Sequence, residues 1–178
     1  MFKMSLVILS LLLPSVVFAY NKTKNEDLFF MTTENKKTIS PNGIEHIKQS
    51  EDLILVAYPD PIGKPTIGYG HLILNSENYD VIDIQTANEL LVRDLNIAID
   101  CINYNVGVGL NQNQFDSLVS FVYNIGCRNF IESTLLTKLN NRDYDGATSE
   151  FKRWVYADGV RLAGLANRRA REQKLFAA

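Results

Sequence analysis

The stretch EDLILVAYPDPIGKPTIGYGH, which spans residues 51–71, decides the fold of the first half of the chain. It opens on Glu51 and passes into residues 53–58, whose apolar composition predicts a β-strand. Proline and glycine punctuate residues 59–65 and predict a turn. Residues 66–74 are broken by two glycines, so they predict one or two short strands. The stretch therefore predicts a small β-sheet and not a barrel.

Three side chains in this stretch suit acid–base chemistry. Glu51 lies beside apolar residues, a setting that suits a carboxyl group that has to hold a proton. Asp60 lies in the solvated turn, and the Thr66 hydroxyl can bind a water molecule near it. One protonated and one ionised carboxyl group are the pair that hydrolysis of a glycosidic bond requires. Taken singly, each residue also suits an ordinary helix end, turn or strand, so the hypothesis rests on their spacing.

Helices are predicted on both sides of this stretch. Ser40 can cap a helix that has a proline in its first turn, which brings Glu51 near the end of that helix. Asp83 caps a long helix that reaches residue 102, because apolar residues recur there at helical spacing. Asn111 caps a second strong helix.

Three more helices complete the second half of the chain, and no strand is expected after Leu74. They are predicted at residues 133–139, 144–156 and 164–176. The predicted fold class is therefore α+β and mostly helical, with a small β-sheet lobe and a helical lobe joined by a long helix. A ligand site is expected between the two lobes.

The N-terminus predicts export. Residues 1–19 combine a basic start, an apolar run at residues 5–13 and a small-x-small end at Ala19, which is typical of a signal peptide. A membrane anchor is the alternative, but the apolar run is shorter than the ~20 residues of a membrane span. We expect cleavage, no stable membrane span afterwards, and a periplasmic or extracellular location. Residues 20–39 predict a flexible polar tail and residues 40–178 the folded domain.

The balance of charge gives no reason to expect a nucleic acid partner. Removal of residues 1–19 leaves 17 Lys and Arg against 20 Asp and Glu. Residues 152–174 carry seven basic and two acidic side chains. They predict either a cationic surface that can approach an anionic polymer or an ordinary solvated helix face. The candidates for a cationic surface are Arg153, Arg161, Arg169 and Arg171.

Cys101 and Cys127 predict a disulfide in an exported chain. Two buried free thiols are the alternative. His46 is expected on a solvated side of a short helix. Two separate histidines and two cysteines do not form a metal-binding set, so neither a metal nor a cofactor is expected.

The spacing around the opening stretch resembles that of one family. Glu51, Asp60 and Thr66, followed by IGYGH at residues 67–71, resemble the active-site segment of phage-type lysozymes (endolysins), glycoside hydrolase family 24. The sequence QNQFDSLVSFVYNIG at residues 112–126 resembles the central helix of that family. The resemblance covers residues 40 to 176, and its remaining parts are STLL at residues 133–136, Trp154, Gly164, Leu165, Arg168, Arg169 and Glu172.

The resemblance implies a lysozyme-like fold and a secreted muramidase. Such an enzyme hydrolyses the β-1,4 bond between N-acetylmuramic acid and N-acetylglucosamine in its partner, bacterial peptidoglycan. Glu51 would be the general acid, and Asp60 would activate a water molecule that Thr66 helps to place. An inverting reaction is implied, with the two carboxyl groups roughly 6.5–9.5 Å apart. The protein is expected to be a monomer.

Five further residues are expected at the substrate site. Arg168 falls where the family has an arginine near the catalytic glutamate, and Tyr123 and Asn124 end the helix that lines the groove in the family. His71 follows a Gly-Tyr-Gly segment, where a structural ion pair or hydrogen bond is a stronger expectation than a role as base. The full set is Tyr58, His71, Tyr123, Asn124 and Arg168.

The residues that flank Glu51 depart from the family pattern. The family commonly has an aromatic residue before the catalytic glutamate and a glycine after it, where this chain has Ser50 and Asp52. Two other functions remain open. A catalytically inactive peptidoglycan-binding module would have no need of the three catalytic side chains. A lytic transglycosylase would need one acid and no carboxylate that activates water.

Overall fold

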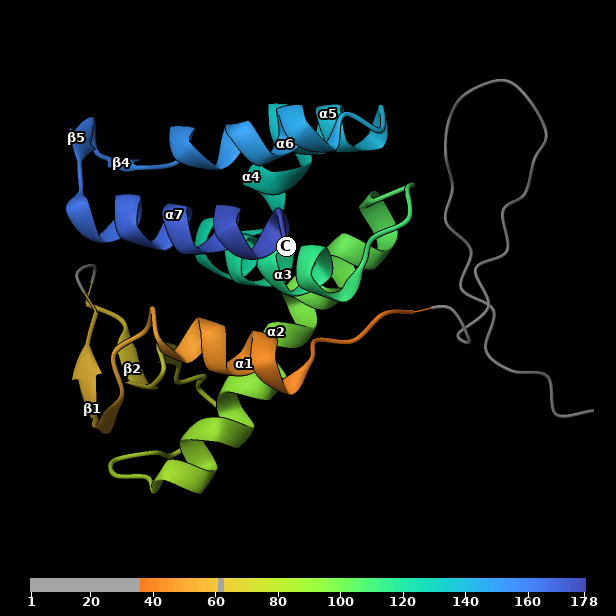
Figure 1. Cartoon of the computed structure of the whole chain (residues 1–178). Coiled ribbons are helices and arrows are strands. Elements are labelled where there is room, and N and C mark those ends of the chain that lie inside the picture. Colours follow the sequence, from red (N-terminus) through yellow and green to blue (C-terminus); the bar gives the residue numbers. More distant parts are fainter. Residues whose placement is uncertain (1–35, 61–62) are drawn as a thin grey trace, which may run out of the picture. The chain divides into compact units, whose positions relative to one another are not determined.

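The computed structural model of the chain describes residues 36–60 and 63–178 (Figure 1). The predicted signal peptide, residues 1–19, and most of the expected tail lie outside the described residues. The folded unit begins at Lys37. There the backbone of Lys37 and the side chain of Asn103 exchange hydrogen bonds of 3.0 and 2.9 Å. The last residues of the expected tail therefore contact the domain.

Helices make up most of the described chain, as predicted for an α+β, mostly helical fold. In Figure 1 the sheet β1-β2-β3 lies at the lower left and α4 to α7 lie at the top, with the long α2 below them. No helix among the described residues combines the length and apolar character that a membrane span needs. In chain order the elements are α1 (Pro41–Lys48), β1 (Ile54–Pro59), β2 (Pro65–Gly68), β3 (His71–Leu72), α2 (Ile84–Asn105), α3 (Gln112–Ile125), α4 (Cys127–Ile131), α5 (Thr134–Asn140), α6 (Tyr144–Glu150), η2 (Phe151–Arg153), β4 (Tyr156–Ala157), β5 (Val160–Arg161) and α7 (Ala163–Phe176).

Helix α1 docks closely on α3. Its predicted cap is confirmed, because the Ser40 hydroxyl accepts a hydrogen bond of 3.1 Å from the Gly43 amide. The same hydroxyl donates to the Asp116 carboxylate of α3. Gly43 is required at this contact, since a Cβ atom there would lie 2.6 Å from the Asp116 side chain. The docking fixes the start of α1, the helix that leads to the turn with Glu51.

The small sheet is antiparallel and matches the predicted strands closely. Tyr58 of β1 pairs with Thr66 of β2, and Thr66 pairs in turn with Leu72 of β3. Gly68 and Gly70 have φ values of 67° and 92°, which glycine adopts without strain. These two residues end β2 and allow the chain to turn back into β3, so the predicted interruption is confirmed.

The two predicted helix caps of the core are also confirmed. Asp83 accepts a hydrogen bond of 2.7 Å from the Thr86 amide at the start of α2. Asn111 and Gln114 form a capping box, with reciprocal bonds of 2.8 and 2.9 Å, at the start of α3. The buried core residues of the two helices include Leu91, Leu95, Ile102, Phe115 and Leu118.

The helix predicted over residues 144–156 ends early, at Glu150. After the short 3-10 helix η2, the chain forms the exposed hairpin β4-β5. Asp158 and Gly159 make its two-residue turn, with φ values of 49° and 77°. Asp-Gly favours such turns because both residues accept positive φ angles. The expectation that no strand follows Leu74 is therefore wrong.

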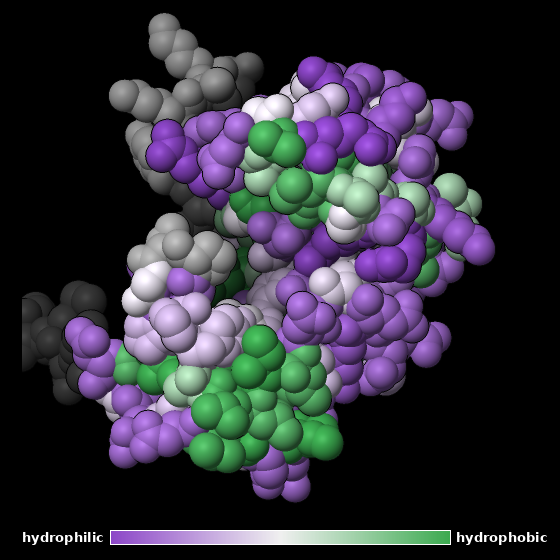
Figure 2. Space-filling view, turned by 90° about the vertical axis from the view of Figure 1, so that its left-hand side faces the viewer, coloured by the Kyte–Doolittle hydropathy of each residue, from purple (hydrophilic) through white to green (hydrophobic). Residues whose placement is uncertain are grey.

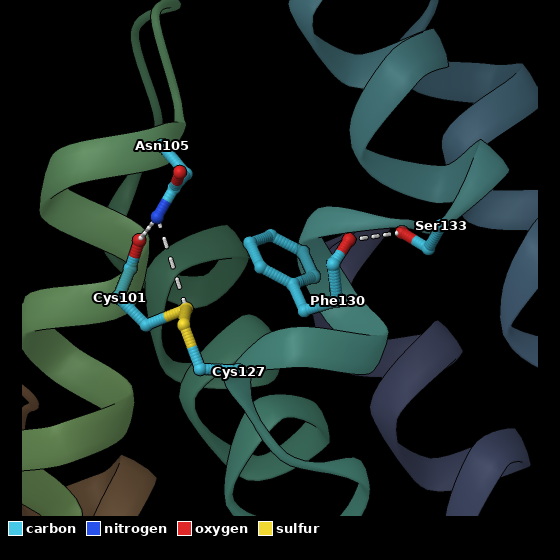
Figure 3. Close-up of a disulfide and its surroundings, with 5 residues drawn as sticks. All are labelled: Cys101, Asn105, Cys127, Phe130 and Ser133. Carbon is cyan, nitrogen blue, oxygen red and sulfur yellow. Dashed lines mark hydrogen bonds between the residues drawn. A yellow bond between two sulfur atoms is a disulfide. The ribbon is translucent and has the colours of Figure 1, made fainter.

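Cys101 on α2 and Cys127 at the start of α4 form a disulfide (Figure 3). The predicted pairing is present, and the alternative of two free thiols is wrong. The Asn105 side chain donates a hydrogen bond of 2.7 Å to the Cys101 carbonyl, and Figure 3 shows both beside the bridge. The disulfide thus ties α2 to the first short helix of the helical lobe.

Removal of the disulfide should lower stability without changing the fold. The bridge closes a sequence separation of 26 residues, so the chain-entropy model gives about 3 kcal/mol. We expect the double variant Cys101→Ser/Cys127→Ser to lose that amount of free energy of unfolding in urea titrations monitored by circular dichroism. Reductant should destabilise the wild type to the same extent and leave the double variant unchanged. Equal stability of wild type with and without reductant would contradict this expectation.

Candidate active site

Glu51 lies in the turn after α1 and is held from the opposite side by α7. The guanidinium of Arg168 donates from Nη1 to Glu51 Oε1 at 2.5 Å. The Arg168 side chain is 5% exposed, whereas that of Glu51 is 21% exposed. A buried cation therefore fixes one carboxylate oxygen of Glu51, while part of the carboxyl group remains open to solvent.

A buried charge network lies beneath Glu51. Glu172 is fully buried and accepts hydrogen bonds from Arg168 Nε at 3.1 Å and from Ser120 Oγ at 2.7 Å. Arg168 also donates from Nη2 to the Ser120 carbonyl at 3.1 Å. The Nε atom of Arg169 lies 3.0 Å from Glu172 Oε2. All three nitrogens of Arg168 are thus bound to protein oxygens.

The same burial shifts the titration of the network. Desolvation raises the pKa of Glu172, although Arg169 and Arg168 act against that shift. Desolvation lowers the pKa of Arg169 to about 10, and the charge of Glu172 opposes it. Arg169 therefore keeps its charge at neutral pH.

Asp60 and Thr66 lie at the two ends of the turn between β1 and β2. Asp60 Oδ1 accepts a hydrogen bond of 2.8 Å from the Lys64 amide. Thr66 is buried and donates from its hydroxyl to the Lys64 carbonyl at 3.1 Å. Tyr58 is opposite Thr66 across the two strands. One hairpin therefore carries three of the predicted site residues.

Tyr123 connects α3 to this region. Its hydroxyl donates to the Tyr69 carbonyl at 3.0 Å. Burial raises the pKa of Tyr123, and the nearby charges of Glu51 and Asp94 raise it further. The charge of Glu51 therefore acts on Tyr123, whose role at the site stays a prediction.

His71 occupies a structural ion cluster between β3 and α2. Its Nδ1 lies 2.8 Å from Asp94 and its Nε2 lies 3.0 Å from Glu77. Arg93 donates to Glu77 at 2.6 Å. These contacts agree with the stronger expectation for His71, a structural ion pair or hydrogen bond. Asp94 and Glu77 were not among the candidate residues.

Three sequence-based expectations about charged and polar side chains need correction or refinement. Asn124 is exposed, and its side chain accepts a hydrogen bond of 2.7 Å from Arg169. Arg169 is 1% exposed and cannot belong to a cationic surface, whereas Arg153 and Arg161 are exposed. His46 is only partly exposed, and its Nε2 atom is buried. The spacing of charged residues on α7 alone did not indicate which of them are buried.

Figure 2 shows the face of the molecule that carries β4-β5 in its upper part and β1 in its lower part. The surface between these parts is hollowed, and an apolar patch lies below the hollow. Exposed apolar side chains of this region include Ile54, Val56 and Val81. No set of three or more metal-ligating side chains that could hold an ion occurs in residues 36–60 and 63–178. The lack of a metal remains a prediction.

The family model described as phage lysozyme matches residues 48–172 of this chain. An endolysin of Acyrthosiphon pisum secondary endosymbiont phage 1 is 43% identical over 142 residues, which cover 78% of this chain and 97% of that relative. The chain belongs to the phage lysozyme family. It is accordingly a glycoside hydrolase, and its lysozyme-like fold was predicted correctly.

Solved structures of this family have the same architecture. The muramidase domain of SpmX from Asticaccaulis excentricus has a TM-score of 0.74 at 36% identity and covers 79% of this chain and 98% of that one. A mutant of P22 lysozyme has a TM-score of 0.73 at 39% identity, with coverage of 80% and 99%. Other relatives are named SAR-endolysins, such as that of Bacteriophage PS119, which is 37% identical over 119 residues, 65% of this chain and 70% of the relative.

The sequence analysis named Arg168 but missed the partners that orient it in this phage lysozyme family member. Ser120 reaches Glu172 from α3, although the two residues are 52 positions apart in the chain. The only local signal is the spacing of Arg168, Arg169 and Glu172, which puts both arginines within one turn of the acid. That spacing is equally typical of a solvated helix, so it did not reveal a buried network.

The cluster around His71 should make the stability of the fold depend on pH. Hydrogen bonds from the Leu74 amide, then from His71 and Arg93, lower the pKa of Glu77 to about 2. Because the folded-state value lies below the unfolded one, Glu77 stabilises the fold above about pH 5, and this contribution is lost as the pH falls towards 2. Glu77→Gln should therefore have a lower Tm than wild type at pH 7, with a difference that narrows between pH 5 and pH 2.

Thermal unfolding followed by circular dichroism measures this difference. Glu132→Gln is the matched control, because Glu132 forms only an exposed pair with Arg128 on α4. Its Tm should stay close to the wild-type value at each pH. A Glu77→Gln deficit of constant size across the pH range would show that the ionisation of Glu77 is not responsible.

Proposed function

We propose that the protein is an exported muramidase that hydrolyses the β-1,4 bond between N-acetylmuramic acid and N-acetylglucosamine in bacterial peptidoglycan. Glu51 acts as general acid, and Asp60 and Thr66 activate water. The observation that carries this proposal is the contact of the partly exposed Glu51 with the buried Arg168. Membership of the phage lysozyme family supports the substrate class.

The hydrogen bond from Arg168 leaves one carboxyl oxygen of Glu51 available for a proton. An arginine can only donate, so the oxygen that faces Arg168, Oε1, has to accept. A proton on Glu51 therefore resides on Oε2, and we propose that it passes from there to the glycosidic oxygen as the C1–O bond breaks. Arg168 itself holds Glu51 in place and does not need to contact the sugar, because its nitrogens are bound to protein oxygens.

The hydrogen bonds around Thr66 suit the placement of water. Its hydroxyl donates its hydrogen to the Lys64 carbonyl, so the hydroxyl oxygen can still accept a hydrogen bond. A water molecule that donates one hydrogen to Thr66 and the other to Asp60 directs its lone pair at C1. Asp60 takes a proton as the water oxygen bonds to C1, and the anomeric configuration is inverted.

The predicted substrate-binding residues divide into two groups. Tyr58 and Tyr123 are partly exposed near the site, and we propose that they contact the sugars. Asn124, His71 and Arg168 are each bound to charged protein groups. We propose that His71 and Arg168 support substrate binding through the elements they hold in place. Their own contact with sugar is not needed for that role.

Replacement of the two carboxyl groups tests the mechanism. Glu51→Gln should lower the rate of peptidoglycan hydrolysis by about 10²- to 10⁴-fold, because the amide cannot donate the proton. Asp60→Asn should reduce the rate similarly. Turbidity clearing of cell-wall suspensions measures both, and Glu132→Gln serves as the surface control. Wild-type clearing by Glu51→Gln would refute the role of Glu51.

The products distinguish hydrolysis from the alternatives. Proton NMR of a fresh digest should show the α-anomer at the new reducing end if the reaction inverts. A 1,6-anhydro sugar, together with an active Asp60→Asn variant, would instead identify a lytic transglycosylase. Binding to cell walls without any cleavage would identify an inactive binding module.

Export is the second part of the proposal. If residues 1–19 are a cleaved signal peptide, the exported protein should begin at Tyr20, and intact-mass spectrometry should give the corresponding mass. The relatives named SAR-endolysins favour the alternative of an uncleaved N-terminal anchor. An exported protein that keeps Met1 in the membrane fraction would support that anchor and contradict cleavage.

A further inference from the structure

The turn that carries Glu51 is held by two neighbouring arginines of α7. Arg168 binds Glu51, and Arg171 donates from its guanidinium to Ser50 Oγ at 2.8 Å. Residues three positions apart lie on the same face of a helix, so two adjacent guanidinium groups bind two consecutive residues.

The backbone alone holds Glu51 weakly. The Ser50 amide donates to the Ile47 carbonyl at 2.8 Å, but the next bond, from the Glu51 amide to the Lys48 carbonyl, is long at 3.4 Å. A bond of that length contributes little to fixing the position of Glu51. The position of Glu51 therefore depends on the side-chain contacts that α7 makes with the turn.

Burial of part of the Arg171 guanidinium costs free energy, and no ion pair offsets that cost among the described residues. The Nε atom of Arg171 and the Nε2 atom of His46 are both buried without a hydrogen-bond partner among the described residues. Burial, followed by the charges of Arg171 and Arg168, lowers the pKa of His46. Arg171 thus lies on the same helix face as Arg168, and its bond to Ser50 goes to an uncharged group. An exposed arginine would avoid these costs.

We propose that Arg171 is a positioning residue for Glu51 and acts through Ser50. This inference rests on the proposed function of Glu51 as general acid. Arg168 fixes one carboxylate oxygen, and Arg171 fixes the residue just before it, so the turn is held at two points. With only one point, the carboxyl group could rotate about the first contact. A misplacement of about 1 Å at a reacting group can cost on the order of 10²-fold in rate.

Kinetics on soluble peptidoglycan fragments test the proposal. Ser50→Ala and Arg171→Gln should each lower kcat about tenfold with KM nearly unchanged, because the proton donor is misplaced while the sugars still bind. The double variant should be no slower than the slower single variant, since both changes remove the same contact. Ser50→Thr keeps the hydroxyl and should restore kcat towards the wild-type value.

Lys138→Gln is the control for a loss that is merely structural. It removes the ion pair of 2.6 Å with Glu150, which joins α5 to α6 and does not involve α1 or α7. It should lower Tm and leave kcat unchanged at a temperature where every variant is folded by circular dichroism. Ser50→Ala should differ from it by losing rate without a matching loss of Tm.

Glu51→Gln, measured in the same assay, separates the two proposals. An active Glu51→Gln refutes the proposed function. An inactive Glu51→Gln together with wild-type kcat in Ser50→Ala and Arg171→Gln overturns the positioning role alone. Multiplicative effects in the double variant, or a Ser50→Thr as slow as Ser50→Ala, overturn it as well. If Arg171→Gln fails to fold, the comparison of Ser50→Ala with Ser50→Thr still decides.

Discussion

The ion pair of Glu172 with Arg168 and Arg169, all three on α7, is the interaction on which the site depends. Glu172 is fully buried, and a buried carboxylate is tolerable only when cations and hydrogen-bond donors surround it. Arg168 and Ser120 supply those donors. Because Arg168 also binds Glu51, the carboxylate that holds α7 against α3 also sets the direction in which Arg168 reaches Glu51.

The segment that carries the proposed acid, base and hydroxyl is tied to the helices at three separate points. Ser40 binds Asp116 of α3 before α1 begins. Glu51 binds Arg168 of α7 after α1 ends. His71 binds Asp94 of α2 beyond the small sheet. Each contact pairs at least one charged group with a donor or acceptor, and charge-assisted bonds of this kind are stronger and more directional than neutral ones. The small sheet of three short strands is in this way oriented by the helices.

The sequence was most informative where the physics is local. A cap joins residues three positions apart, so Asp83 with Thr86 and Asn111 with Gln114 were predictable from sequence. The burial of Arg169 was not, because its ion pair with Glu172, three positions away, has a spacing that is equally typical of a solvated helix. The prediction that the helix extends to residue 156 was also wrong, for a different reason. Its apolar residues fit a helical period, but the Asp-Gly turn at residue 158 closes a hairpin and takes the chain out of the helix.

The spacing of Glu51, Asp60 and Thr66 predicted the candidate catalytic residues, but spacing does not say which atom of each side chain donates a hydrogen and which accepts one. That information lies in the partners of these side chains. Arg168 has only hydrogens to offer, so in the proposed mechanism a proton on Glu51 lies on its other oxygen. The Lys64 carbonyl has only lone pairs to offer, so it takes the hydrogen of Thr66 and leaves an acceptor for water. Arg168, which can only donate, beside the proposed acid and the Lys64 carbonyl, which can only accept, beside Thr66 thus determine which atoms at the proposed site can donate and which can accept. Both come from residues outside the catalytic pattern.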